Sequence, residues 1–331
     1  MPKRRALAQV APTLLGAVGT AAAAAFGPEF VKSFVGTTDQ ALWFGALFAA
    51  SALLIAFALI LRRRYERETQ VAILASAIDP FGRARGQAIY ESARRYCERT
   101  FTTVVTASSD SVPENRNDAA AAVDRLGERV NELVALCEGL SQSSVRVSLV
   151  LTMRNAAAFR LGLAFGRSHR REVVVHHGDS HGYFPAARVV GPPHHAEHRS
   201  LTRDKLRVDG KDASRACLFL NLEGRGNASL ERIIRACKEH DVGWIVEIKV
   251  ANSPLPRTQP AYESVVSYAM AAWQELRPPN PQGGNILIVD GVAVFSFLLG
   301  SQLADDPDGP WVYFEYDIEN GRYYPFKPTA P

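Results

Sequence analysis

The sequence has little charge in its first part. Only Lys3, Arg4, Arg5, Glu29, Lys32 and Asp39 are charged before Arg62, whereas the rest of the chain carries 34 basic and 32 acidic residues. The chain from Arg62 onward, here called the body, is therefore nearly neutral. This charge balance excludes the class of proteins that coat long nucleic acid through a basic face. An anionic ligand therefore has to be bound by a local site.

Cysteines and familiar catalytic motifs are also scarce. The four cysteines, Cys97, Cys137, Cys217 and Cys237, form no C-x-x-C pair, which predicts reduced, mostly buried thiols in the cytoplasm. The sequence contains no G-x-G-x-x-G or Walker motif, and no motif indicates a Ser-His-Asp arrangement. We therefore expect neither a cofactor nor a catalytic residue from the known motifs.

Residues 41–61 (ALWFGALFAASALLIAFALIL) are uncharged and are followed at once by RRRYER. A helix of this length spans about 31 Å, which matches the hydrocarbon core of a bilayer. The aromatic Trp43 near one end and the arginines at the other end are typical of a transmembrane helix. The basic cluster predicts that the large C-terminal body lies on the cytoplasmic side of the inner membrane.

Residues 6–28 are also uncharged, but they are rich in Ala and contain Pro12. They are either a second spanning helix, which would make a two-pass hairpin, or the apolar core of a signal segment. The stretch is long for a signal segment, so we favour the hairpin. In both interpretations the body stays in the cytoplasm.

The body begins with a segment that we expect to be a helical connector. Between Glu66 and Gly139, apolar residues recur at helical spacing, with a break at Asp79-Pro80. One apolar stripe within it comprises Val123, Leu126, Val130, Leu133, Val134 and Cys137. A coiled-coil seam is one interpretation of the stripe, but it is short, so packing against the next domain is favoured.

From Val145 the pattern changes to apolar strands that alternate with helices. We predict strands at 145–152, 172–176, 215–222, 244–250, 285–289 and 311–317, and helices at 156–166, 229–240, 261–276 and 293–300. This alternation indicates an α/β fold with a mostly parallel sheet covered on both faces. Two segments are similar to each other, since FRLGLAFG and FSFLLGSQ are each followed by a β-rich run and a Tyr-Pro pattern. Two related α/β halves explain this similarity.

Ligands of open α/β sheets bind beyond the carboxyl ends of the strands, where helix N-termini point N–H groups at anions. Arg154 and Arg225 are the guanidinium groups best placed there to meet phosphate. Polar loop residues can equally serve as helix caps, but four loops at one sheet edge favour a shared site. The candidate ligand-binding residues are Thr152, Arg154, Asn155, Glu223, Arg225, Asn227, Ser253 and Asp290.

Two further patterns have weaker functional interpretations. Seven of the eight histidines lie between His169 and His198, but their spacing matches no zinc motif, so we expect no metal site. Glu247-Ile248-Lys249 matches the E-x-K of metal-dependent nucleases, for which Asp241 is the nearest further carboxylate. Because Glu247 and Lys249 share one face of a strand, a cross-strand charge pair explains them as well.

The region from Val145 to Pro328 contains the motifs VSLVLTMRNAAAFRLGLAFGR, VVVHH, HGYFPA, ACLFLNLEGRGN, NILIVDGVAVFSFLLGSQL and WVYFEYDIENGRYYPF. With these motifs it resembles the SAVED domain, the sensor of bacterial cyclic-oligonucleotide immune systems (CBASS). The resemblance implies two fused Rossmann-like, CARF-like halves that bind a cyclic di-, tri- or tetranucleotide and then oligomerise to activate an effector. Ligand residues vary within the family, so the candidate residues above rest on their placement.

The expected organisation is a transmembrane hairpin (1–65), a helical connector (66–144) and a SAVED sensor domain (145–331). We predict a membrane-anchored sensor and effector of anti-phage defence that is not an enzyme. It would bind a cyclic oligonucleotide, with a trinucleotide favoured, form a homo-oligomer and disrupt the bilayer. The alternatives are a tethered nuclease or cyclic-nucleotide phosphodiesterase that uses Glu247 and Lys249, and a tethered module that recruits another protein.

Overall fold

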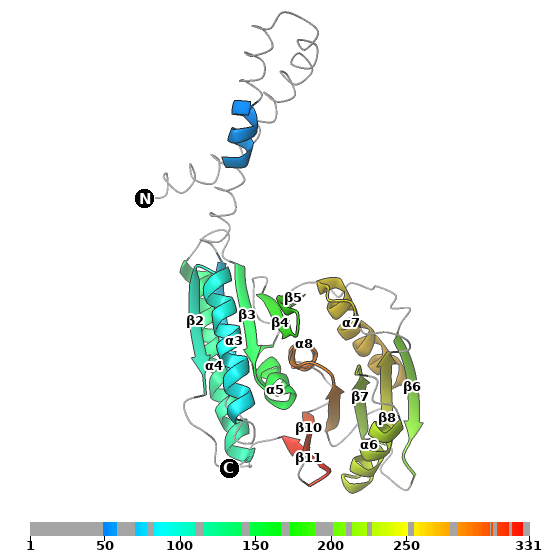
Figure 1. Ribbon diagram of the computed structural model, residues 1–331. Coiled ribbons are helices and arrows are strands. Elements are labelled where there is room, and N and C mark those ends of the chain that lie inside the picture. The colour runs from blue at the N-terminus through cyan, green and yellow to red at the C-terminus, as the bar shows by residue number, and fades with distance from the viewer. Residues whose placement is uncertain are drawn as a thin grey trace, which may run out of the picture. The chain divides into compact units, whose positions relative to one another are not determined.

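Figure 1 shows the computed structural model of the chain, in which contacts define two units, Met1–Gln70 and Val71–Pro331. The structure describes residues 49–57, 70–77, 83–109, 116–140, 146–166, 173–189, 201–209, 214–223, 227–250, 255–278, 284–304, 306, 310–317 and 320–326. In the first unit, residues 49–57 are helical. The predicted spanning segments, 6–28 and 41–61, otherwise lie outside the described residues. Within the described ranges, no helix has both the length and the apolar character needed to cross a membrane.

The second unit contains two β-sheets, ordered β2-β1-β3-β4-β5 and β6-β8-β7-β9-β10-β11. The strands of the first sheet are β1 (Gln70–Ser76), β2 (Thr103–Ser108), β3 (Arg146–Thr152), β4 (Val173–Asp179) and β5 (Gly182–Arg188). Those of the second are β6 (Leu201–Arg207), β7 (Ala216–Asn221), β8 (Trp244–Val250), β9 (Asn285–Asp290), β10 (Trp311–Asp317) and β11 (Arg322–Phe326). The helices of this unit are α3 (Arg83–Thr100), α4 (Arg116–Leu140), α5 (Asn155–Phe165), α6 (Asn227–Glu239), α7 (Gln259–Leu276) and α8 (Ala293–Leu303).

The two sheets have the same topology. In each, strands and helices alternate up to a final strand that turns back antiparallel, β5 against β4 and β11 against β10. The order β2-β1-β3-β4-β5 thus corresponds to β8-β7-β9-β10-β11, and β6 is an additional antiparallel strand on β8. The expected pair of Rossmann-like α/β halves is confirmed.

The prediction of a helical connector is wrong for two segments. Residues 70–76 (QVAILAS) and 103–108 (TVVTAS) form the parallel strands β1 and β2, so the first α/β half begins at Gln70 rather than at Val145. The central part of β1 is completely buried. A short apolar run that is buried on both faces cannot be distinguished by periodicity from a buried helix, and for this reason the strand was missed.

The strand and helix pattern after Val145 is confirmed, and the strand Trp244–Val250 has the predicted limits. Strands β5, β6 and β11 were not predicted. Each lies at a sheet edge, and their sequences (GYFPAAR, LTRDKLR and RYYPF) contain charges or proline. Edge strands need no continuous apolar run, because one side of the strand and part of its face are open to water.

The apolar stripe of α4 packs against the first half of the fold, as predicted. Val123, Leu126, Val130 and Val134 are buried in the large core that α5 and α8 share. Gly127 of α4 faces Ala164 of α5 so closely that an added Cβ would lie 2.6 Å from the Ala164 Cβ. On the opposite face of the first sheet, a smaller core collects Ala93, Cys97 and Phe101.

The two halves meet where α5 and α8 cross at Gly162 and Gly300. A Cβ on Gly162 would overlap the carbonyl oxygen of Phe297, and a Cβ on Gly300 would overlap that of Phe159. The contacts are reciprocal because the sequences Phe159–Gly162 and Phe297–Gly300 occupy equivalent positions in their helices. The similar Leu-Gly helices of the two halves are therefore the surfaces through which the halves pack.

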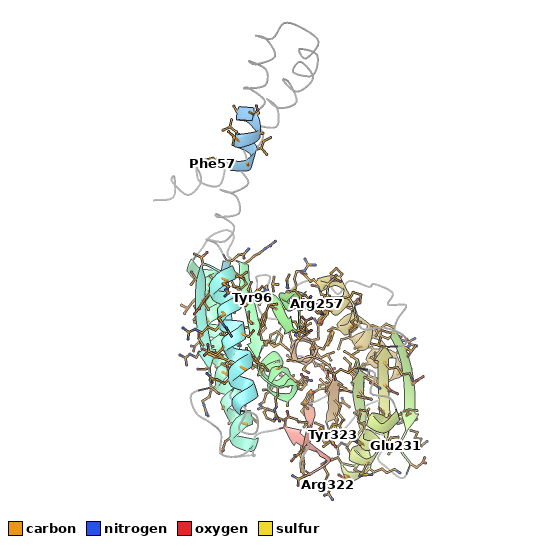
Figure 2. All side chains as sticks on the ribbon, viewed as in Figure 1. Phe57, Tyr96, Glu231, Arg257, Arg322 and Tyr323 are labelled. Carbon is orange, nitrogen blue, oxygen red and sulfur yellow. The ribbon has the colours of Figure 1, made fainter. Side chains whose placement is uncertain are left out.

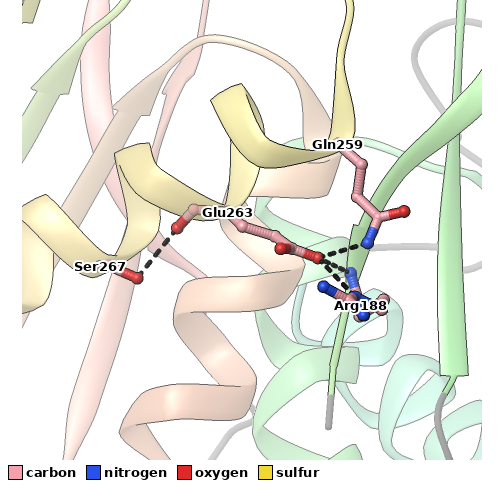
Figure 3. A network of polar contacts seen from close by, with 4 residues as sticks. All are labelled: Arg188, Gln259, Glu263 and Ser267. Atoms are coloured by element: carbon pink, nitrogen blue, oxygen red, sulfur yellow. Dashed lines mark hydrogen bonds and ion pairs between the residues drawn. The ribbon is translucent and has the colours of Figure 1, made fainter. Parts of the chain in front are cut away.

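A second contact between the halves joins α7 to β5 (Figure 3). The Oε1 atom of Glu263 accepts hydrogen bonds from the backbone N of Arg188 at 2.8 Å, from Arg188 Nε at 3.2 Å and from Gln259 Nε2 at 2.7 Å. Glu263 is largely buried. Hydrogen bonds to a charged acceptor are stronger than neutral ones, so this carboxylate anchors α7 of the second half on the last strand of the first sheet.

The glycine contact predicts a large loss of stability in Gly162→Ala. The added methyl group cannot be accommodated without separating α5 from α8, and overpacking of this kind costs about 1–3 kcal/mol or more. This loss outweighs the gain in helix propensity of up to about 1 kcal/mol. Urea unfolding measures the free energy. Gly86→Ala on α3 is the control, because its Cβ meets nothing within 4 Å. Equal stability of the two variants would contradict the proposed close contact.

Candidate functional site

The N-termini of α5 and α8 lie next to each other, at the edge where the carboxyl ends of β3 and β9 are. Asn155, the first residue of α5, donates from Nδ2 to the carbonyl oxygens of Gly291 at 2.8 Å and Val289 at 3.2 Å, just before α8 begins. At the other end, Ser301 of α8 donates to the carbonyl oxygen of Gly166 at 2.8 Å. The two helices therefore run side by side in the same direction. The first N–H groups of a helix have no acceptor within the helix, and its N-terminal end carries a positive partial charge. Two such ends side by side form an arrangement that suits one anionic ligand.

Neighbouring strands bring further predicted residues to this edge. Asn221 of β7 pairs in register with Asp290 of β9, and the N–H of Leu222 donates to the carbonyl oxygen of Asp290 at 2.9 Å. The Thr152 hydroxyl donates to the carbonyl oxygen of Ala75 at the end of β1. Thr152, Arg154, Asn155 and Asp290 thus lie around the paired helix N-termini, and Glu223 follows the end of β7.

The structure describes only some of the remaining predicted site residues. Arg225 and Ser253 lie outside the described residues, and Asn227 is the first residue of α6. Arg154 precedes α5 with its side chain 44% exposed, and its Nη1 lies 3.7 Å from Glu315 Oε1. That distance is within ion-pair range but too long for a hydrogen bond. Arg154 therefore remains partly accessible to an anion at this edge.

The site is not symmetric, although the frame that carries it is. In the equivalent positions of the two halves, Thr152 corresponds to Asp290, Arg154 to Val292 and Asn155 to Ala293. The first half therefore supplies a hydroxyl, a guanidinium and an amide, where the second half supplies a carboxylate and two apolar side chains. Asn155 also has a structural role, because its side-chain amide donates hydrogen bonds to the backbone of the second half.

An aromatic cluster next to this edge escaped the sequence analysis. Tyr262 of α7 stacks on Phe295 in the first turn of α8 with ring centroids 4.8 Å apart, and it also contacts His177 and Phe184. Arg257, labelled in Figure 2, has its guanidinium over the Phe184 ring, 4.8 Å from the ring centroid. Burial lowers the pKa of His177, so this imidazole is neutral near pH 7. Flat aromatic and imidazole faces of this kind can stack on nucleobases.

The guanidinium of Arg257 is fixed in this cluster by the turn between β4 and β5. Its Nε lies 2.6 Å from Asp179 Oδ2, and its Nη2 donates to the carbonyl oxygen of Gly182 at 3.1 Å. Asp179 also accepts a hydrogen bond from the backbone N of His181. No local sequence motif predicts this arrangement, because the residues come from separate halves of the fold. Only the folding of α7 onto β5 brings them together.

The first half also contains a buried histidine. His176 on β4 is 6% exposed, and its Nδ1 lies 3.0 Å from the hydroxyl of Tyr96 on α3. Tyr96 stacks on Tyr183 with centroids 4.8 Å apart, and Phe101 meets the imidazole edge-on. The equivalent position in the second half is Phe314. Burial lowers the pKa of His176 to about 4, so the imidazole is neutral in the folded protein.

The E-x-K segment (Glu247-Ile248-Lys249) and the histidine cluster are the two sequence patterns with weaker functional interpretations. Glu247 is buried and accepts a hydrogen bond from Asn221 Nδ2 at 3.1 Å. Lys249 lies 2.5 Å from Asp204 on β6 and 4.0 Å from Glu247, so the predicted cross-strand charge pair is present. Asp241 lies before the start of β8, at the end opposite Lys249. Of the clustered histidines the structure describes His176, His177 and His181. In the described ranges, no group of three or more His, Cys, Asp or Glu side chains could hold a metal ion.

Comparisons with known proteins support the fold. No protein-family model matches the chain, and no curated protein sequence matches it. Among solved structures, the chain is similar to the Acinetobacter baumannii Cap4 SAVED/CARF-domain containing receptor with the cyclic trinucleotide 2'3'3'-cAAA, with a TM-score of 0.50 and 12% identity. The match covers 87% of this chain and 59% of the receptor chain, so this protein spans about three-fifths of that receptor. The Moraxella osloensis Cap4 receptor matches with a TM-score of 0.44 and 14% identity, over 86% of this chain and 57% of its own.

Burial of neutral His176 predicts that the protein loses stability in weak acid. The folded-state pKa of about 4 is below the ordinary value of about 6.5. The contribution of neutral His176 to the free energy of unfolding is therefore fully present above pH 6.5. It falls as the pH decreases, because the unfolded state then binds a proton that the folded state does not. The expected loss is about 2 kcal/mol between pH 7 and pH 5. Urea unfolding at both pH values should show that His176→Phe removes most of this difference and leaves only the contribution of His177, whose pKa burial also lowers. The control His181→Asn, at an exposed turn, should keep the full difference. An unchanged pH dependence in His176→Phe would contradict the assignment.

Proposed function

We propose that this protein is a sensor of a cyclic oligonucleotide in bacterial anti-phage defence. The observation that carries the proposal is the pair of parallel helices α5 and α8, whose N-termini meet at one edge beside Arg154. The fold is that of a SAVED/CARF-domain receptor, and the similar Acinetobacter baumannii protein was solved with a cyclic trinucleotide. The resemblance of the sequence from Val145 to Pro328 to the SAVED family points to the same ligand class.

The chemistry of the edge suits a cyclic nucleotide. Two helix N-termini offer backbone donors to phosphates, and Arg154 adds a planar guanidinium. The neighbouring ring surfaces of His177 and Phe184 provide faces for bases. A compact ring of phosphates and bases presents both kinds of group within one small ligand.

The asymmetry of the site favours a ligand without two-fold symmetry. A symmetric cyclic dinucleotide would place identical groups against Arg154 in one half and against Val292 in the other. A cyclic trinucleotide has no two-fold axis, so its unequal sides can face unequal half-sites. We therefore favour a trinucleotide as the ligand.

We predict that Arg154→Ala weakens binding of a cyclic trinucleotide such as 2'3'3'-cAAA by about 1.5–3 kcal/mol, the range for charge-assisted hydrogen bonds. Isothermal titration of the purified chain measures the affinity. The control is Arg203→Ala, which removes another partly exposed, ion-paired arginine, on the distant edge strand β6. Equal affinity of both variants and the wild type would place the ligand elsewhere. Both variants should unfold at nearly the wild-type temperature, because exposed ion pairs contribute little stability.

We further propose that the ligand-bound protomers associate and that the N-terminal segments then damage the inner membrane without catalysis. The support is the sequence of residues 41–61, which has the length and composition of a spanning helix. Small residues such as Gly45, Ala49 and Ala52 permit close approach of such helices. The sensor would lie in the cytoplasm, where Arg62–Arg64 hold it.

An exchange of residues 41–61 for an unrelated apolar span of equal length tests this effector role. The exchanged chain should remain in the membrane fraction and bind nucleotide, but it should lose ligand-dependent depolarisation of the cell. Membrane potential is followed with a voltage-sensitive dye. The companion variant is Glu247→Gln, which should depolarise the cell like the wild type. Toxicity that survives the exchange and disappears in Glu247→Gln would favour the nuclease instead.

A further inference from the structure

The two halves differ at one sheet edge. In the second sheet β8 is followed by β6, which pairs with it antiparallel along its whole length, from Leu201 opposite Val250 to Arg207 opposite Trp244. The strand equivalent to β8 in the first sheet is β2, and it is the last strand on that side. Figure 1 shows β2 and β6 at the two outer edges of this unit. In the first half, the position equivalent to that of β6 lies on the outer side of β2. No strand occupies this position among the described residues.

Among the described residues, β2 has a backbone partner on one side only, the strand β1. Apart from its ladder with β1, Thr103–Ser108 forms no hydrogen bond with other described residues. Thr103 and Thr106 are exposed, and Val104 and Val105 are half-buried. The nearest described segment before β1 is the helix at 49–57, so the described chain supplies no counterpart of β6.

The chemistry of β2 differs from that of every other edge strand in the described chain. Its sequence, TVVTAS, has no charge and no proline, and its first four residues are β-branched valine or threonine. The other edge strands are β5 with Pro185, β11 with Pro325, and β6 with Arg203, Asp204 and Lys205 near its middle. Proline and charge are the usual protection of sheet edges against pairing with another chain. Among the described edge strands, β2 alone lacks that protection.

We propose that β2 pairs antiparallel with β2 of a second copy of this chain, so that the first sheets of two protomers form one continuous sheet. The equivalent edge in the second half shows that this position of the fold accepts an antiparallel strand. Two copies of an uncharged strand meet without like charges across the pair, which are destabilising. Among the described edges, only another β2 offers a partner free of charge and proline. The pairing needs no nucleotide, so it does not rest on the proposed function.

Light scattering of the full chain during size exclusion, without nucleotide and over a range of concentrations, tests the pairing. The wild type should form a dimer, and the double variant Thr103→Lys/Thr106→Lys should raise the dimer dissociation constant about tenfold or more, because it places four lysines along the paired strands. The matched control is Thr202→Lys, an exposed threonine on the other outer edge strand, which should dimerise like the wild type.

Hydrogen exchange locates the contact. Amides of residues 103–108 should exchange faster on dilution of the wild type, and they should exchange fast at every concentration in the double lysine variant. A monomeric wild type at all concentrations overturns the proposal. So does a dimer that survives in the double lysine variant, or slow exchange in β2 that dilution does not change, which would mean that another segment or protein covers the strand.

Discussion

The close approach of α5 and α8 is the constraint on which the rest of the structure depends. The two helices touch at Gly162 and Gly300, where backbone lies against backbone and no side chain fits between them. Because the contact is reciprocal, it fixes both the distance and the direction of the halves. It aligns the two N-termini at one edge, which creates the site, and it brings α7 onto β5, where Glu263 holds Arg188.

A symmetric frame with asymmetric chemistry is the main feature of this molecule. The strand order is the same in both halves, yet the candidate site residues differ, since Arg154 is equivalent to Val292 and Thr152 to Asp290. The interior differs as well, since the neutral His176 with its Tyr96 partner takes the position of Phe314, which lies in an apolar core and contacts the ring of His240. Duplicated halves in one chain can change independently, whereas two identical subunits have to keep the same residues on both sides. A single chain is thus free to recognise a ligand that has no two-fold axis.

The aromatic cluster shows how the same contact that joins the halves also shapes the site. Arg257 and Tyr262 belong to the second half in sequence, but they lie against Asp179, His177 and Phe184 of the first. The ion pair of Arg257 with Asp179 holds the β4–β5 turn, and the stack of Tyr262 on Phe295 connects it to the start of α8. Residues that stabilise the interface thereby also set the position of ring surfaces beside the helix N-termini.

The sequence by itself determined the alternation of strands and helices after Val145, the internal similarity of the two Leu-Gly helices, and the location of Arg154, Asn155 and Asp290 at strand ends. Those features depend on local periodicity and on the rule that ligands lie beyond the carboxyl ends of parallel strands. The tertiary structure alone decided that QVAILAS is a strand, because a run buried on both faces has no period that separates it from a helix. It alone decided that Asn155 bonds the opposite half and that Arg257 meets Asp179. Such pairs join residues far apart in the chain, and their partners are chosen by the packing of helices at two glycines, which no local pattern records.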